Sequence, residues 1–284
     1  MTLQQLYQHA KKTFSQAGLE SPAFDAICLL EHVFGLGRQA LILHGDEPAP
    51  SQQIPAFLSL VQKRAARQPL QYLLGEWPFL SLTLSVGQGV LIPREDTELL
   101  VHTAVQHLPE SVPLTVLDLC AGSGAVGLGV VSMRPKARVT CVERFDAAWH
   151  YLQQNTAKYQ TKFPVQTIQA DILDPLTPTQ FSPVDAILSN PPYITTADLA
   201  SLQAEVLREP ATALDGGPDG LLFYRALASL WAPLLKPSGF LAVEIGEGQA
   251  QAVRQLFFHA GLAHCETFCD LSGMERVILA CRSL

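Results

Sequence analysis

The spacing of apolar residues divides the chain near position 76. Before that point apolar residues recur every three or four positions, a period that is typical of short amphipathic helices. The first such segment carries its apolar residues at Leu3, Leu6, Tyr7, Ala10 and Phe14. Further helices are expected after Ser21-Pro22, near 39–43 and from 51–55 onward, and Gly18 and Gly35 should end the first two. The pattern predicts a small helical domain over residues 1–75.

The pattern changes to strict alternation after Phe79. Apolar residues at positions 80, 82, 84 and 86 alternate with serine and threonine, as in a strand with one buried face. We expect residues 76–93 to form a β-hairpin that links two domains. Beyond it, Asp96 or Thr97 is expected to cap a helix that runs to about Leu108.

From residue 114 onward short apolar strands alternate with helical segments. Strands are expected at 114–120, 138–143, 165–170, 184–189 and 239–245, and helices at 124–133, 146–159, 221–235 and 248–260. The last two segments, 264–270 and 276–281, should pair as an antiparallel hairpin. Repeated β-α units predict an α/β fold over residues 94–284, with a mostly parallel sheet between two layers of helices. Ligands of such sheets bind at the carboxyl ends of the strands.

Composition and cysteine spacing narrow the class of protein. The 284 residues are 48% apolar, which is enough for one large and one small packed domain. No apolar run approaches the roughly 20 residues that span a bilayer, and the first residues lack the order of a signal peptide, so a cytoplasmic location is expected. The six cysteines form no C-x-x-C pair. We expect them to be small buried side chains and expect no metal site.

The net charge of −7 is unevenly distributed along the chain. Residues 1–75 carry six Lys/Arg against five Asp/Glu, whereas the rest carries thirteen against twenty-one. An acidic domain of this kind matches nucleic-acid phosphate poorly, so a nucleic-acid substrate is disfavoured. The only concentrated positive charge is formed by Lys63, Arg64 and Arg67, which we expect on the exposed face of a helix. Such a cluster is either an ordinary solvated face or a docking surface for a partner.

The expected strand at 184–189 ends abruptly at Asn190-Pro191-Pro192-Tyr193. Each proline fixes φ, lacks an N–H and restricts the residue before it. The Asn190 amide, the Pro191 carbonyl and the Tyr193 ring are then free to face outward, and together they suit a planar NH2 group. Taken alone, the four residues fit a proline-rich loop that closes a buried strand even better.

A glycine-rich loop follows the first strand of the expected sheet, with the sequence D-L-C-A-G-S-G at 118–124. Bare backbone there can approach a ligand closely. Glu143 ends the next strand, nineteen residues after Gly124, where a carboxylate can accept the hydroxyls of a ribose. Because Gly122, Gly124 and Gly127 also match G-x-G-x-x-G, a dinucleotide ligand stays open.

Two further carboxylates favour S-adenosylmethionine over a dinucleotide. Asp118, beside the loop, would repel a pyrophosphate and attract an ammonium group. Asp171 and Ile172 end the third strand, where they suit the amino group and the ring of adenine. An ordinary turn residue explains Asp171 equally well. S-adenosylmethionine, which carries both groups, is the expected cofactor.

These motifs, in this order, resemble class I S-adenosylmethionine-dependent methyltransferases that act on an amide or amine nitrogen. Four further stretches resemble the protein-(glutamine-N5) methyltransferase family known as HemK or PrmC, so the resemblance covers nearly the whole chain: P-L-Q-Y-L-L-G-E-W-P-F at 69–79, L-I-P-R-E-D-T-E at 91–98, E-P-A-T-A-L-D-G-G-P-D-G-L at 209–221 and D-L-S-G-M-E-R at 270–276. N-P-P-Y alone is shared with adenine-N6 DNA methyltransferases. The chain departs from the family at Cys120-Ala121, where Gly-Thr is more usual, and at Glu143, where Asp is commoner.

The resemblance implies a Rossmann-like class I methyltransferase sheet that methylates the glutamine of a Gly-Gly-Gln motif in peptide-chain release factors, with residues 1–75 gripping that partner. The expected catalytic residues are Asn190, Pro191, Pro192 and Tyr193. The expected cofactor-binding residues are Asp118, Cys120, Ala121, Gly122, Ser123, Gly124, Glu143, Asp171, Ile172 and Asn190. Alternatives are a ribosomal-protein glutamine methyltransferase, a nucleic-acid adenine-N6 methyltransferase, a dinucleotide oxidoreductase and a catalytically silent binding module.

Overall fold

The computed structural model describes residues 1–110 and 112–282, which form two compact units. Unit 1 contains residues 1–76 together with residues 203–208, and unit 2 contains residues 77–202 and 209–284. The short segment 203–208 therefore belongs to unit 1, although the chain on both sides of it belongs to unit 2. Nothing in the local sequence of this segment indicates that assignment.

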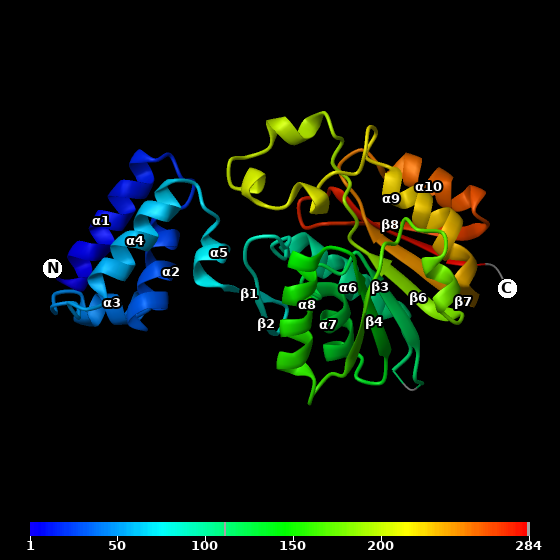
Figure 1. The fold of residues 1–284 in the computed structure, drawn as a ribbon, viewed down its shortest axis with the longest axis horizontal. Helices are drawn as coiled ribbons and strands as arrows, with labels where there is room; N and C mark the ends of the chain where they lie inside the picture. The colour runs from blue at the N-terminus through cyan, green and yellow to red at the C-terminus, as the bar shows by residue number, and fades with distance from the viewer. Residues whose placement is uncertain (111, 283–284) are drawn as a thin grey trace. The chain divides into compact units, whose positions relative to one another are not determined.

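Unit 1 is helical, as the spacing of its apolar residues predicts (Figure 1). Its helices are α1 (Leu3–Gln16), α2 (Pro22–Phe34), α3 (Arg38–His44), α4 (Ile54–Ala65) and the short α5 (Leu70–Leu74), which the spacing does not predict. The Thr2 side chain and Gln5 form a capping box that begins α1. Gly35 ends α2 in the left-handed conformation that glycine adopts without strain. Phe14, Leu29 and Phe57 are buried in the core of the unit.

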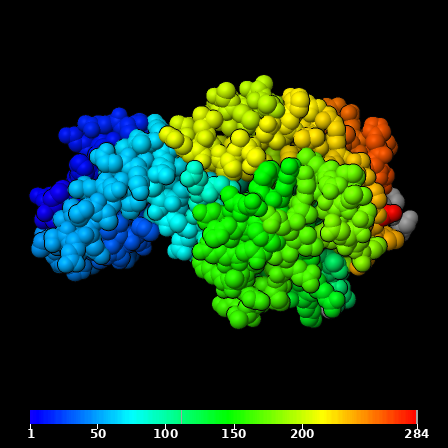
Figure 2. Space-filling view, viewed as in Figure 1, coloured from blue at the N-terminus to red at the C-terminus, as the bar shows by residue number. Residues whose placement is uncertain are grey.

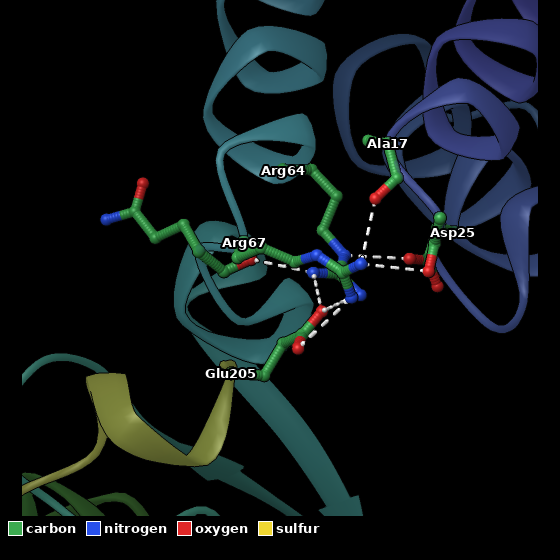
Figure 3. A network of polar contacts seen from close by, with 7 residues as sticks. Ala17, Asp25, Arg64, Arg67 and Glu205 are labelled. Atoms are coloured by element: carbon green, nitrogen blue, oxygen red, sulfur yellow. Dashed lines mark hydrogen bonds and ion pairs between the residues drawn. The ribbon is translucent and has the colours of Figure 1, made fainter. Parts of the chain in front are cut away.

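The basic cluster of α4 is not the exposed patch that the sequence predicts. Arg64 is only 8% exposed. Its Nε donates to Asp25 Oδ2 at 2.7 Å and its Nη1 donates to Glu205 Oε1 at 3.0 Å (Figure 3). Arg67 Nη1 also donates to Glu205, at 3.2 Å, and only Lys63 of the three basic residues is exposed.

The prediction fails because the buried face of α4 continues past its apolar residues. Phe57 and Val61 are buried, and position 64 follows them at the next step of the same helical face. A guanidinium on that face needs carboxylate partners. Asp25 of α2 supplies one and Glu205, 141 positions along the chain, supplies the other. Figure 2 shows the yellow atoms of the segment around Glu205 against the cyan end of α4.

Unit 2 contains a seven-stranded sheet in the order β5-β4-β3-β6-β7-β9-β8. Its strands are β3 (Thr115–Leu119), β4 (Arg138–Glu143), β5 (Val165–Gln169), β6 (Val184–Ser189), β7 (Leu235–Glu244), β8 (Leu262–Cys269) and β9 (Glu275–Arg282). β3 to β7 pair in parallel, whereas β9 is antiparallel to both β7 and β8. The predicted α/β sheet with its antiparallel C-terminal hairpin is confirmed. A separate hairpin, β1 (Glu76–Phe79) with β2 (Leu82–Ser85), lies in the segment predicted to hold one.

Helices cover both faces of this sheet (Figure 1). On one face lie α6 (Glu95–His107), α7 (Ala125–Met133) and α8 (Asp146–Tyr159), and on the other lie α9 (Leu222–Ala226) and α10 (Ala250–His259). Strand alternation produces the two layers, because Ala186 packs with the first group of helices and its neighbour Ile187 packs with the second. Short 3-10 turns occur at Thr177–Gln180, Asp198–Ser201, Val206–Arg208 and Ala211–Ala213.

Three local predictions for unit 2 need correction. Arg94, not Asp96 or Thr97, is the N-cap of α6, and the Thr97 hydroxyl makes other contacts. The predicted helix at 221–235 is an α-helix only as far as Ala226 and continues as π-helical and 3-10 turns to Leu234. The cysteines are all free thiols, but only Cys141 is fully buried and Cys269 is exposed.

The described residues place no group of three or more His, Cys, Asp or Glu side chains where they could hold a metal ion. No single helix in the described part of the chain is both long and apolar enough to cross a membrane. α2 and α3, which are bent by 77° at their junction, satisfy that test only when they are taken together.

Candidate active site

A cavity opens in unit 2 where the parallel strands of the sheet end. Its empty space, together with the solvent at its open mouth, is about 920 Å³. The carboxyl ends of adjacent parallel strands meet at one edge of a sheet, so residues from distant motifs converge there. Of the residues predicted from the sequence, the cavity brings together Cys120, Ala121, Gly122, Ser123, Glu143, Asp171, Ile172, Asn190 and Pro192. Asp118, Gly124, Pro191 and Tyr193 are not on its lining.

The glycines of the loop after β3 have different tasks. Gly122 has a φ of 55°, and a Cβ added there would meet nothing closer than Val90 Cγ2 at 4.0 Å. The backbone at Gly122 is therefore accessible to a ligand. A Cβ added at Gly127 would lie 2.4 Å from Cys141 Sγ, so this glycine lets α7 approach β4 closely. Gly124, with a φ of 84°, turns the chain into α7.

Asp118 is buried beneath this loop instead of facing the cavity. Only 1% of the residue is exposed. Its Oδ2 accepts the Gly127 N–H at 2.8 Å and lies 3.6 Å from Cys141 Sγ, whereas its Oδ1 has no hydrogen-bond partner among the described residues. Burial raises the pKa of Asp118 to about 7, against the opposing effect of the Gly127 bond. The geometry assigns Asp118 to the loop–helix junction, and the predicted contact with a ligand ammonium stays a prediction.

Glu143 reaches the cavity from the end of β4. Its Oε1 accepts the N–H groups of Arg144 and Phe145, both at 2.8 Å, and its Oε2 accepts the Gly122 N–H at 2.9 Å. Burial raises the pKa of Glu143, while these three N–H groups act to lower it. An ionised carboxylate has about four acceptor positions, so roughly one, on Oε2, is left for a ligand hydroxyl.

Asp171 and Ile172, which follow β5, line the cavity and are held in place by hydrogen bonds. Asp171 Oδ1 accepts the Leu173 N–H at 2.9 Å, as a turn residue does, and its Oδ2 pairs with Arg144 at 2.7 Å. Asp171 therefore shapes a turn and also lines the cavity, and its predicted contact with an adenine amino group stays a prediction. The Ile172 carbonyl accepts the buried Trp231 indole N–H at 2.9 Å, which fixes this apolar side of the site.

Asn190 is held by residues that local sequence reasoning missed. Its Nδ2 donates to Thr97 Oγ1 at 3.0 Å, and the Thr97 hydroxyl donates to Glu244 Oε2 at 2.6 Å. The Tyr193 hydroxyl lies 3.5 Å from Glu244 Oε1. Burial raises the pKa of Tyr193, so its phenol stays neutral. Thr97 and Glu244 look unremarkable in the sequence, as an apparent helix cap and a residue of the predicted strand 239–245.

The backbone of Pro192 and Tyr193 is supported from behind by the D-G-G-P-D-G stretch. A Cβ at Gly216 would lie 2.8 Å from the Pro192 carbonyl oxygen, and one at Gly220 would lie 2.4 Å from that of Tyr193. The Tyr193 carbonyl also accepts an N–H of Gln249 at 2.9 Å. Both glycines are therefore needed for the close approach of these two segments.

Glu209 joins two motifs that are far apart in the sequence. Its buried carboxylate accepts the Ile92 N–H at 2.9 Å and also pairs with Arg94. Arg94 and Pro210 both line the cavity. The stretches at 91–98 and 209–221 thus build one wall of the site together.

Comparison with known proteins agrees with this geometry. Residues 5–75 match the model of the PrmC N-terminal domain, and residues 96–226 match that of the methyltransferase small domain. The chain is 39% identical to the release factor glutamine methyltransferase of Moorella thermoacetica, over 99% of each chain. It is 37% identical to the corresponding enzyme of Geobacter sulfurreducens, over 98% of this chain and 95% of that one. A crystal structure of a methyltransferase from Pyrococcus furiosus has the same fold, with a TM-score of 0.53, 13% identity and coverage of 83% of this chain and 100% of that one.

The two relatives match unit 1 as well as unit 2, since both alignments run over nearly the full length of the chain. The family predicted from the four motif stretches is confirmed, and with it the prediction of an S-adenosylmethionine-dependent protein-glutamine methyltransferase. The chain belongs to the release factor glutamine methyltransferase family.

Proposed function

We propose that this protein transfers a methyl group from S-adenosylmethionine to the side-chain nitrogen of the glutamine in the Gly-Gly-Gln motif of peptide-chain release factors. The observation that carries the proposal is that Asn190 shares one cavity with Glu143 and the glycine loop. Glu143 can therefore bind the nucleoside of the cofactor while Asn190 accepts a hydrogen bond from the substrate amide in the same cavity.

The residues present fit S-adenosylmethionine. The open space over Gly122 admits a ligand against bare backbone. The remaining acceptor position of Glu143 Oε2 suits one ribose hydroxyl, and Asp171 with Ile172 suits adenine. The bound cofactor supplies an electrophilic methyl group on a sulfonium.

The residues after β6 address the weakness of the nucleophile. An amide nitrogen attacks poorly because its lone pair is delocalised into the carbonyl group. Asn190 Oδ1 and the Pro191 carbonyl would each accept one of its N–H bonds and so stabilise the positive charge that develops on nitrogen. Pro192 and Tyr193 would hold the amide plane in position for in-line attack. Transfer of the methyl group would leave a neutral thioether, and the nitrogen would give up one proton to water, which restores a neutral methylated amide.

We assign recognition of the release factor to unit 1, which matches the PrmC N-terminal domain. With Arg64 and Arg67 paired inside the unit, Lys63 is the only member of the basic cluster left for a partner. We expect no nucleic acid as a partner, because unit 2 is acidic, and no membrane, because the sequence has no apolar run of the roughly 20 residues that span a bilayer. The cytoplasmic location is likewise a prediction.

A methyl-transfer assay tests the proposed function. Purified protein with methyl-labelled S-adenosylmethionine should label a release factor, and mass spectrometry should place the methyl group on the Gly-Gly-Gln glutamine. A release factor with that glutamine replaced by alanine is the matched control and should stay unlabelled. Labelling of ribosomal proteins or of adenine in DNA, without labelling of the release factor, would contradict the proposal.

Glu143→Ala is expected to weaken S-adenosylmethionine binding by about 10- to 100-fold, because hydrogen bonds to charged groups contribute about 1.5–3 kcal/mol. Titration calorimetry measures the effect. Glu143→Asp, which keeps the carboxylate that is commoner in the family, is the control and should bind within a few-fold of the original chain. Unchanged affinity of Glu143→Ala would show that the carboxylate only holds the loop.

A further inference from the structure

We propose that Thr97 and Glu244 fix the orientation of the Asn190 side chain, so that its oxygen and not its nitrogen faces the substrate amide. The inference rests on the proposed function, because that function requires an acceptor at this position. Thr97 and Glu244 are positioning residues in this scheme, since they act through Asn190.

Three elements of unit 2 bring the groups together. Asn190 directly follows β6, Glu244 ends the adjacent strand β7, and Thr97 lies in the first turn of α6. Thr97 and Glu244 are 3% and 2% exposed, so water does not compete for their hydrogen bonds. The two bonds, at 2.6 and 3.0 Å, form a continuous chain from Glu244 to Asn190.

The number of protons gives this chain a direction. An ionised glutamate can only accept, so the single hydroxyl proton of Thr97 points to Glu244. The hydroxyl oxygen can then only accept a hydrogen bond from Asn190, so the Asn190 NH2 group must be the donor. The other branch of the amide is Oδ1, and it becomes the branch that is available to the cavity. In a flipped amide the N–H groups of Asn190 would face the N–H groups of the substrate nitrogen. Both sides would then be donors, and no hydrogen bond could form.

The environment of Glu244 makes the direction of these hydrogen bonds sensitive to pH. Burial is the main reason that the pKa of Glu244 is raised to about 7, and the nearby charge of Asp96 adds to it. The Thr97 bond, the charge of Arg276 and the Tyr193 hydroxyl act against this rise. The Tyr224 hydroxyl donates to the main-chain carbonyl of Glu244 at 2.8 Å. Among the described residues Glu244 forms no ion pair, so the charge of Arg276 acts on it only without direct contact.

The sign of the pH effect follows from the raised pKa. Above pH 7 the carboxylate is ionised and the chain of hydrogen bonds has one direction. Below pH 7 the carboxyl group gains a proton that it can donate to Thr97, whose own proton is then free to point to Asn190 Oδ1. The amide loses its preference, so the correctly oriented fraction of the enzyme falls as the solution becomes more acidic.

Steady-state kinetics on the full chain test the inference. We expect kcat for release-factor methylation to fall about fivefold between pH 7 and pH 6, in proportion to the ionised fraction of Glu244, whose pKa is about 7. The acidic limb should disappear in Glu244→Gln, which also separates Glu244 from Asp118, whose pKa is likewise raised to about 7. A limb that persists in Glu244→Gln would overturn the inference.

Substitutions at Thr97 give the matched comparison. Thr97→Val keeps the shape but removes the hydroxyl, and we expect its kcat to fall at least tenfold while the Kd for S-adenosylmethionine changes less than threefold. Thr97→Ser restores the hydroxyl and should recover most of kcat. Equal kcat values for the valine and serine variants would overturn the inference. If the valine variant fails to fold, the pH profiles of the original chain and of Glu244→Gln decide the question alone.

A measurement without turnover separates this inference from the proposed function. The NMR signal of the Asn190 side-chain NH2 group, identified by its loss in Asn190→Ala, should shift with a midpoint near pH 7. The shift should be absent in Glu244→Gln. A pH-dependent signal in a protein that methylates no release factor would support the hydrogen bonds from Glu244 through Thr97 as the cause of the Asn190 orientation, and it would refute the proposed substrate. A signal that does not change with pH in an active enzyme would refute this account of the Asn190 orientation and leave the proposed function standing.

Discussion

Replacing Asn190 by alanine should lower kcat about 100- to 1000-fold while the affinity for S-adenosylmethionine stays within a few-fold. The expected loss corresponds to about 2.7–4 kcal/mol of transition-state stabilisation, the typical effect of removing one contact that meets developing charge. Asn190 meets that charge on the substrate nitrogen, so its removal affects the reacting state more than the bound cofactor. Single-turnover methylation and calorimetry on the same preparation measure the two quantities.

Glu143→Ala provides the reciprocal control for this result. It should weaken cofactor binding and leave the rate at saturating cofactor close to that of the original chain. If Asn190→Ala methylates at a near-normal rate, the acceptor role of the residues after β6 is wrong. If it also loses cofactor affinity by more than tenfold, Asn190 belongs to the cofactor site instead.

Local patterns were sufficient to predict the sheet and the edge at which the site lies. The strands at Arg138–Glu143 and Val184–Ser189 and the helix at Asp146–Tyr159 have the predicted bounds. Their limits are readable because an apolar run or helical period stops at a turn residue or proline. The residues after β3, β4, β5 and β6 then had to converge, since parallel strands present their carboxyl ends at one edge.

Residues that act through distant partners could not be identified in this way. Thr97 is separated from Glu244 by 147 positions, and Ile92 from Glu209 by 117. A threonine near a helix start fits a cap equally well, so its type does not reveal its partner. Asp118 shows a related limit, because its position in the sequence does not tell whether the carboxylate points into the sheet–helix layer, where it accepts the Gly127 N–H, or into the cavity.

The error at Arg64 has a thermodynamic consequence in unit 1. A charge that was expected in water is instead buried between two carboxylates, Asp25 and Glu205. Removing one partner of a buried ion pair leaves the other uncompensated, and this costs more than the intact pair contributes to stability. The side chain of Asp25 is only 6% exposed, so it would be the stranded group. Burial already raises its pKa, despite the attraction of Arg64.

Arg64→Met is therefore expected to destabilise unit 1 by about 3–5 kcal/mol. Hydrogen exchange of the α2 and α4 backbone amides in the full-length protein measures this loss of stability within unit 1. Lys63→Met, an exposed change one position away on the same helix, is the matched control and should cost less than about 0.5 kcal/mol. The double variant Asp25→Leu/Arg64→Met removes both charges and should regain much of the stability that Arg64→Met loses. Equal exchange rates in Arg64→Met and Lys63→Met would show instead that Arg64 behaves as the solvated surface residue that the sequence alone predicts.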